Sequence, residues 1–217
     1  MKNIFYIILM TSTLFFLQAC SEDEEVATTT STSQTVTDST GASVSLDGTY
    51  LQACTAGSSE YTKLEVVISG STYNLKNESF SDDTCATATY TYTSGRTFAV
   101  GSATTTSGSD NSSKNDVAVT KIELKLQSIG FTILDDTMVT QWNDASVYGF
   151  TDWANGTAKS LLGLNGDGTT DNVSVVDAAL YDIWYISGTS FQIGGGDVDQ
   201  YTVYPTELDY STILVKQ

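Results

Sequence analysis

A strict alternation of apolar and polar residues constrains the fold of this chain most strongly. Ile122, Leu124 and Leu126 alternate with the polar residues Lys121, Glu123, Lys125 and Gln127. Leu64, Val66 and Ile68 repeat the pattern in an earlier segment, and Tyr90 and Tyr92 stand among threonines. Because successive side chains of a β-strand point to opposite faces, this period of two predicts strands with one buried face.

Further segments have the same character and are separated by turn-forming residues. The other candidate strands are Leu46–Cys54, Ser71–Phe80, Arg96–Thr106, Ala178–Ile186 and Ser190–Ile193. Ser69-Gly70-Ser71 and Ser94-Gly95 predict hairpin turns, since glycine favours the backbone conformations that tight turns need. About eight strands with short connections indicate a sandwich or a closed barrel, and an antiparallel up-and-down barrel is the simpler arrangement.

One segment departs from the strand pattern. Asp135 to Ser146 carries Met138, Val139 and Trp142 at helical spacing, and its opening aspartates suit a helix N-terminus. We therefore expect an all-β fold with one short helix that covers an end or a flank of the sheet.

The N-terminus has the features of a bacterial lipoprotein signal. Lys2 precedes a mostly apolar run from Ile4 to Phe16, and the segment closes with Leu17-Gln18-Ala19-Cys20. This ending matches a lipobox, in which the cysteine receives the lipid and becomes the first residue of the mature chain. An ordinary secretory signal or a single membrane helix is the alternative, but the run is short for a span of about 20 residues. We predict a signal peptide over residues 1–19 and lipidation of Cys20.

The segment after Cys20 is predicted to be a tether. Residues 20–45 are rich in serine and threonine with almost no large apolar side chains, so they cannot repay the entropy of ordering. Its acidic opening, Ser21 to Glu25, is either a solvated charge run or resembles an export signal for surface lipoproteins. We expect a lipid-anchored protein of the bacterial outer membrane, facing the periplasm or the cell surface, with a folded domain over residues 46–217.

Charge and composition exclude several classes of function. The formal net charge of −17 disfavours binding to nucleic acid, which requires clustered lysine and arginine. The chain has no histidine, so it lacks the usual general base and the commonest metal ligand. We predict a protein that is not an enzyme and that has no cofactor and no metal.

Cysteine usage suggests one disulfide. If lipid occupies Cys20, Cys54 and Cys85 remain in an oxidising compartment, where disulfides persist. Two free buried thiols are the alternative reading.

Three fragments together resemble the lipocalin-like domains of small secreted and lipid-anchored bacterial proteins. Leu46-Asp47-Gly48-Thr49-Tyr50 is similar to the Gly-x-Trp entry to the first strand, with tyrosine in place of tryptophan. Phe80 to Cys85 resembles an acidic turn leading to a cysteine, and Ala178–Ile193 with Tyr204 to Leu208 resembles the closing strands and exit. The resemblance implies an eight-stranded antiparallel barrel whose interior is either filled by its own side chains or leaves room for one small ligand. Tyr50 can plug the base of this barrel only if its hydroxyl finds a partner.

Aromatic residues are the candidate ligand contacts. The residues expected near a cavity are Tyr90, Tyr92, Trp142, Trp153 and Trp184. Each could instead belong to the core. The loop from Asn165 to Asp171 resembles part of a calcium loop, but glycine at position 163 and Ser174 stand where acidic ligands belong, so a polar turn explains it equally well.

The sequence thus predicts a lipid-anchored envelope protein that binds a small, partly apolar ligand without catalysis. Its partners would be the membrane, through the lipid, and that ligand. The alternative is a structural or adhesive protein with a solid barrel that acts through contacts with another envelope protein.

Overall fold

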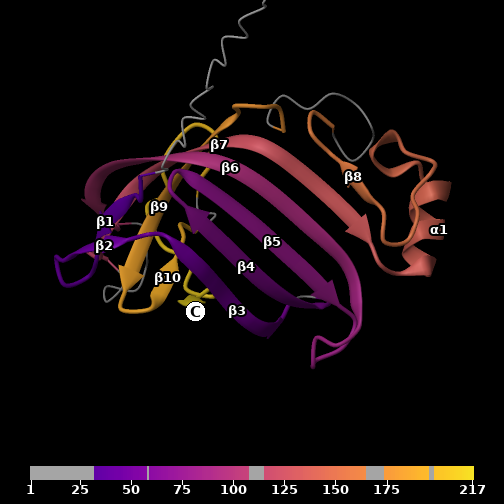
Figure 1. The fold of residues 1–217 in the computed structure, drawn as a ribbon, viewed down its shortest axis with the longest axis horizontal. Coiled ribbons are helices and arrows are strands. Elements are labelled where there is room, and N and C mark those ends of the chain that lie inside the picture. The colour runs from indigo at the N-terminus through magenta and orange to yellow at the C-terminus, as the bar shows by residue number, and fades with distance from the viewer. Residues whose placement is uncertain (1–31, 58, 108–114, 165–173, 196–197) are drawn as a thin grey trace, which may run out of the picture. The chain divides into compact units, whose positions relative to one another are not determined.

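A closed antiparallel β-barrel forms the body of the protein (Figure 1). The computed structural model describes residues 32–57, 59–107, 115–164, 174–195 and 198–217. Eight strands follow one another around the barrel in chain order. They are β3 (Gly48–Ala56), β4 (Tyr61–Ser69), β5 (Thr72–Phe80), β6 (Ala88–Thr105), β7 (Ala118–Ile133), β9 (Ala179–Ser187), β10 (Ser190–Gln192) and β11 (Leu214–Lys216). Since β11 pairs with β3, the sheet closes, and the predicted up-and-down barrel is confirmed.

The two predicted hairpin turns have different outcomes. Gly70 lies between β4 and β5 with a φ of 55°, as a tight turn requires. The prediction of a turn at Ser94-Gly95 is wrong, because both residues lie inside the long strand β6. Gly95 instead marks a shift in the β6–β7 register, and a Cβ on it would lie 2.5 Å from the Ser128 Oγ. Glycine inside a strand often marks such an irregularity or a close approach.

The predicted helix is α1 (Asp136–Asp144), which directly follows β7. Asp135 is its N-cap, and the Asp135 Oδ1 accepts a hydrogen bond of 2.7 Å from the Met138 backbone N–H. The helix ends before Ser146, which has a left-handed φ of 51°. A short 3-10 helix, η2 (Val147–Gly149), and strand β8 (Ala158–Ser160) follow, and β8 pairs with β7 at the same end as α1 (Figure 1).

Part of the segment assigned to the tether is folded. Residues 35–37 (β1, Thr35–Thr37) pair with residues 43–45 (β2, Ser43–Ser45), and Val36 faces Val44 across this hairpin. Val36 is buried in the barrel core, and the Ser39 N–H donates to the Ile186 carbonyl at 2.9 Å. Two valines are enough to hold this hairpin in place, because they pack against an existing core and need not form one of their own.

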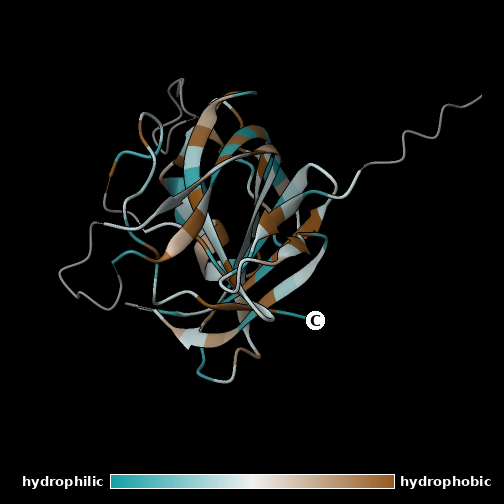
Figure 2. Ribbon diagram, turned by 90° about the vertical axis from the view of Figure 1, so that its left-hand side faces the viewer, coloured by the Kyte–Doolittle hydropathy of each residue, from teal (hydrophilic) through white to brown (hydrophobic). Residues whose placement is uncertain are grey.

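Apolar side chains gather in clusters, of which the largest fills the barrel. Figure 2 shows apolar and polar residues alternating along the strands, as the sequence pattern predicts. The buried members of the barrel cluster are Val36, Leu46, Tyr50, Val66, Ile68, Tyr73, Phe98, Ile122, Leu124, Trp184, Ile186, Phe191 and Leu214. A second cluster joins the far ends of β6 and β7 to α1 and the residues that follow it.

The predicted disulfide is present. Cys54 of β3 is bonded to Cys85 in the connection after β5, with 5.9 Å between the two Cα atoms. The bond fixes this connection against the barrel wall.

Candidate functional site

Aromatic residues seal one half of the barrel interior. The Trp184 ring lies 5.0 Å from the Phe98 ring, 5.2 Å from the Phe191 ring and 5.5 Å from the Tyr73 ring, measured between centroids. Tyr50 packs on Phe191 at 5.0 Å, and its hydroxyl donates a hydrogen bond of 2.7 Å to the Leu46 carbonyl. The buried hydroxyl of Tyr50 thus has the hydrogen-bond partner that a buried tyrosine needs. We call this layer of Tyr50, Phe98, Trp184 and Phe191 the sealed half.

A cavity of about 140 Å³ adjoins the sealed half inside the barrel. Its lining comes from the inward-facing positions of β5, β6, β7 and β9 and from the segment after β10. The lining residues are Tyr73, Leu75, Tyr92, Ser94, Arg96, Leu124, Leu180, Asp182, Ile193, Gly194 and Gln200. We call this space the inner cavity. It combines aliphatic walls with two charged side chains.

Asp182 is the buried carboxylate of the inner cavity, with 6% of its surface exposed. Its Oδ1 accepts hydrogen bonds of 2.8 Å from the backbone N–H groups of Ile183 and Gly194, and its Oδ2 accepts one of 2.9 Å from the Trp184 indole. Burial raises the pKa of Asp182 to about 6, although these hydrogen bonds act in the opposite direction. Gly194 permits the contact, because a Cβ there would lie 2.6 Å from both Asp182 and Pro205.

Arg96 is the sole arginine of the chain, and it lies on β6 opposite Tyr73 of β5. It is half-buried and lines the inner cavity. Among the described residues, no ion pair or hydrogen bond is formed by its guanidinium group. Its positive charge still acts on the cavity, where it opposes the burial that raises the pKa values of Asp182 and Tyr73. The guanidinium donors are therefore available to a guest molecule.

The structure brings one of the five predicted ligand residues to the lining of the inner cavity and a second next to it. Tyr92 lines it directly, and Trp184 lies beneath it, bonded to Asp182. Tyr90, Trp142 and Trp153 lie in the second cluster and do not line the cavity, whereas Tyr92 contacts both.

Close aromatic packing explains the position of these three residues. The Phe131 ring stacks on Tyr90 at 4.8 Å and on Trp142 at 4.7 Å, and Trp153 meets Trp142 edge-on at 5.1 Å. The Tyr90 hydroxyl donates to the Glu60 carboxylate. Such stacked and edge-on pairs stabilise packing, so this cluster holds α1 against the ends of β6 and β7.

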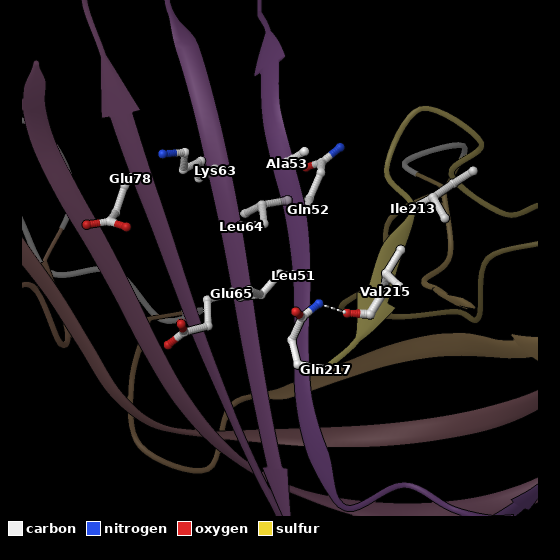
Figure 3. A pocket seen from close by; sticks show the side chains of 10 residues that line it. All are labelled: Leu51, Gln52, Ala53, Lys63, Leu64, Glu65, Glu78, Ile213, Val215 and Gln217. Atoms are coloured by element: carbon white, nitrogen blue, oxygen red, sulfur yellow. Dashed lines mark hydrogen bonds between the residues drawn. The ribbon is translucent and has the colours of Figure 1, made fainter. Parts of the chain in front are cut away.

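A larger hollow lies where β3 and β11 part (Figure 3). The register of this seam has two residue pairs, Leu51 with Val215 and Tyr50 with Lys216, and the Gln217 N–H donates to the Thr49 carbonyl beside them at 2.9 Å. The groove measures about 720 Å³. Its lining residues are Leu51, Gln52, Ala53, Lys63, Leu64, Glu65, Glu78, Ile213, Val215 and Gln217. We call it the seam groove.

Two of the three charged residues of the seam groove, Lys63 and Glu78, have partners within the protein. The Lys63 ammonium donates to the Cys85 carbonyl at 3.3 Å and lies 5.0 Å from the Phe80 ring centroid. Glu78 pairs with Lys76 at 2.8 Å. The seam groove thus resembles an ordinary protein surface with two exposed apolar residues, Ile213 and Val215, whereas the inner cavity places the buried Asp182 and the half-buried Arg96 among aliphatic walls inside the barrel. We therefore take the inner cavity as the candidate functional site.

Sequence reasoning missed the two charged residues of this site. The sequence contains a signal for both. Arg96 is two positions from Phe98, and Asp182 is two positions from Leu180 and from Trp184, so each charged residue shares a strand face with apolar ones. A charged residue in an apolar stripe is unusual unless it is paired or functional.

Some sequence predictions lie outside the described residues, namely lipidation of Cys20 and the loop from Asn165 to Asp171. Within the described ranges, no cluster of three or more acidic or cysteine side chains could hold a metal ion. In the same ranges, no helix has the length and apolar character needed to cross a membrane. Neither a protein-family model nor a curated protein matches the sequence.

Proposed function

We propose that this chain is a non-catalytic binding protein of the bacterial cell envelope that holds a small, partly apolar molecule inside its barrel. The inner cavity carries this proposal, since four aliphatic side chains and an unpaired guanidinium face the same space. Ligand sites commonly combine apolar walls with a few convergent polar groups.

The barrel is compatible with this role. Eight-stranded barrels of this kind either fill their interior with side chains or leave space for one small ligand. The resemblance of Leu46 to Tyr50 and of Ala178–Ile193 to lipocalin-like domains supports the same function, with Tyr50 closing the base of the barrel.

The proposed location rests on the N-terminal sequence. A lipid on Cys20 would anchor the protein to the outer membrane, facing the periplasm or the cell surface. The Cys54–Cys85 disulfide is compatible with an oxidising compartment outside the cytoplasm. A Cys20→Ala variant should leave the membrane fraction, and membrane retention of that variant would contradict the proposed anchor.

Native mass spectrometry tests the binding function. The full chain, purified in mild detergent from the producing bacterium, should carry a reproducible adduct that is lost on denaturation. An Arg96→Gln variant prepared in parallel should carry less of it. A bare protein at its calculated mass, with lipid and disulfide, would favour the alternative function.

The alternative is a structural or adhesive role through protein contacts, and the seam groove favours it. Ile213 and Val215 are 47% and 43% exposed beside this groove. Exposed apolar side chains that gather at one place often mark an interaction surface. Under this alternative, Val215→Glu would abolish a crosslink to an envelope partner, whereas under the ligand-binding function it would leave the adduct unchanged.

A further inference from the structure

We propose that the ligand of the inner cavity is a short-chain organic carboxylate whose head group binds Arg96. This inference rests on the proposed function and names its ligand class. It follows from the position of the Arg96 charge, from the hydrogen bonds that already hold the Asp182 carboxylate, and from the size of the inner cavity.

The guanidinium of Arg96 lacks a partner inside the barrel. Arg96 is half-buried, and none of its nitrogen atoms is among the fully buried atoms of the described residues without a hydrogen-bond partner, so the guanidinium is open to solvent or to a guest at the cavity wall. Asp182 is the nearest candidate, but no ion pair within 4.0 Å joins the two side chains, and three N–H donors already hold its oxygens. A bound anion would pair with this charge in place of solvent, and a carboxylate matches the fork of guanidinium donors.

Asp182 also limits the charge of the ligand. Its carboxylate shares the cavity with Arg96, so the cavity offers a single positive charge, and any second negative charge on the ligand would stay uncompensated beside Asp182. A monoanion is therefore favoured over a dianion such as hydrogen phosphate. A cationic ligand is disfavoured because Arg96 would repel it.

Tyr73 provides a second contact for the head group. It lies directly opposite Arg96 in the β5–β6 register and lines the cavity. Burial raises the pKa of Tyr73, so its hydroxyl keeps its proton at neutral pH and can donate to a carboxylate oxygen.

The walls and the volume define the rest of the ligand. Leu75, Leu124, Leu180 and Ile193 provide aliphatic surface, which favours a hydrocarbon chain over a polar one. A cavity of about 150 Å³ accommodates benzene, and the inner cavity measures about 140 Å³. A carboxylate of about four to six carbons therefore fits, and a long fatty acid does not.

Isothermal titration calorimetry on the full chain in mild detergent tests this inference. The ligands are pentanoate, the neutral pentanol, the cationic pentylamine and inorganic phosphate. The variants are Arg96→Gln, Arg96→Lys and a control, Lys125→Gln. Lys125 lies on the outer face of β7 and is 51% exposed, so the control removes the same charge from the opposite side of the wall.

Pentanoate should bind the natural chain and Lys125→Gln equally well. Arg96→Gln should weaken binding by roughly tenfold to a hundredfold, and Arg96→Lys should restore part of the loss. Unchanged circular dichroism and melting curves would show that Arg96→Gln is folded.

Stronger binding of pentanol, pentylamine or phosphate, or equal pentanoate binding by Arg96→Gln, would overturn the carboxylate inference. The native adduct described above would still stand in that case, so the proposed function and the ligand class fail separately. Absence of binding for all four ligands overturns the inference as well.

Discussion

The two halves of the barrel interior are filled in opposite ways. In the sealed half, Tyr50, Trp184 and Phe191 are at most 2% exposed and pack ring against ring. In the inner cavity, Arg96 and Asp182 stand at the equivalent inward positions and leave about 140 Å³ between the walls. The two halves are adjacent along the strands. On β6 the next inward-facing residue after Arg96 is Phe98, and on β9 the next one after Asp182 is Trp184.

This difference implies that the sealed half mainly stabilises the fold and that the inner cavity mainly serves binding. Burial of large apolar side chains is the dominant favourable contribution to folding, and it is concentrated in the sealed half. The inner cavity also has buried walls, such as Tyr73 and Leu124, but it leaves space unfilled and holds charges that are costly to desolvate. Substitutions in the sealed half should therefore unfold the protein, while substitutions at Arg96 should change binding with little loss of stability.

The largest effect is expected for Trp184→Ala. The substitution removes a fully buried side chain that touches three aromatic rings and donates to Asp182, so we expect a loss of about 3–5 kcal/mol in the free energy of unfolding. Urea denaturation followed by circular dichroism measures it. If Arg96→Leu destabilised the protein as much as Trp184→Ala, the proposed separation between the two halves would be wrong.

A similar effect is expected for loss of the disulfide. Cys54 and Cys85 are 31 residues apart, and a cross-link over such a loop stabilises by about 3–4 kcal/mol in the chain-entropy model. The double variant Cys54→Ala, Cys85→Ala should melt several degrees lower than the natural chain. A melting curve of the natural chain that does not change under reducing conditions would contradict this expectation.

The charge of Asp182 should make stability depend on pH. Its pKa is raised from 3.8 in the unfolded chain to about 6 in the fold, so the folded state binds more protons between these values. The free energy of unfolding is therefore expected to fall by about 3 kcal/mol as the pH rises from below 4 to above 6. The opposite pH dependence is expected below pH 4, where three other carboxyl groups titrate. The pKa values of Asp38, Asp82 and Asp152 are lowered in the fold, so these groups make the free energy of unfolding rise with pH there.

Comparison of the natural chain with Asp182→Asn isolates this contribution. The difference between their unfolding free energies should change between pH 4 and pH 7. As the pH rises, the natural chain should become less stable relative to the variant. Parallel pH profiles for the two chains would show that Asp182 is ionised with a normal pKa.

The smallest effect is expected for Tyr50→Phe. The ring stays in place, but the Leu46 carbonyl loses its 2.7 Å hydrogen bond, which should cost about 1–2 kcal/mol. Tyr201→Phe, at a residue that is 42% exposed, is the matched control and should change stability by less than about 0.5 kcal/mol. Equal effects of the two substitutions would mean that the Tyr50 hydroxyl does not secure the base of the barrel.

Local patterns predicted most of the fold. The alternation around Ile122 placed β7, the aspartate before Met138 placed the start of α1, and the two cysteines were correctly paired. The turn prediction at Ser94-Gly95 failed because a glycine inside a strand and a glycine in a turn look alike in sequence. The hairpin over residues 35–45 was missed because Val36 gains its burial from a core formed by distant strands.

The alternation in the sequence indicates which side chains of a strand share a face, because strand parity is a local property of the backbone. It did not determine the level along the barrel at which each inward side chain lies. That level depends on the register of all eight strands and on closure between β11 and β3, which are set by contacts between residues far apart in the chain. Only the tertiary structure therefore placed Arg96 and Asp182 in one cavity, while it placed Tyr90, Trp142 and Trp153 in a separate cluster.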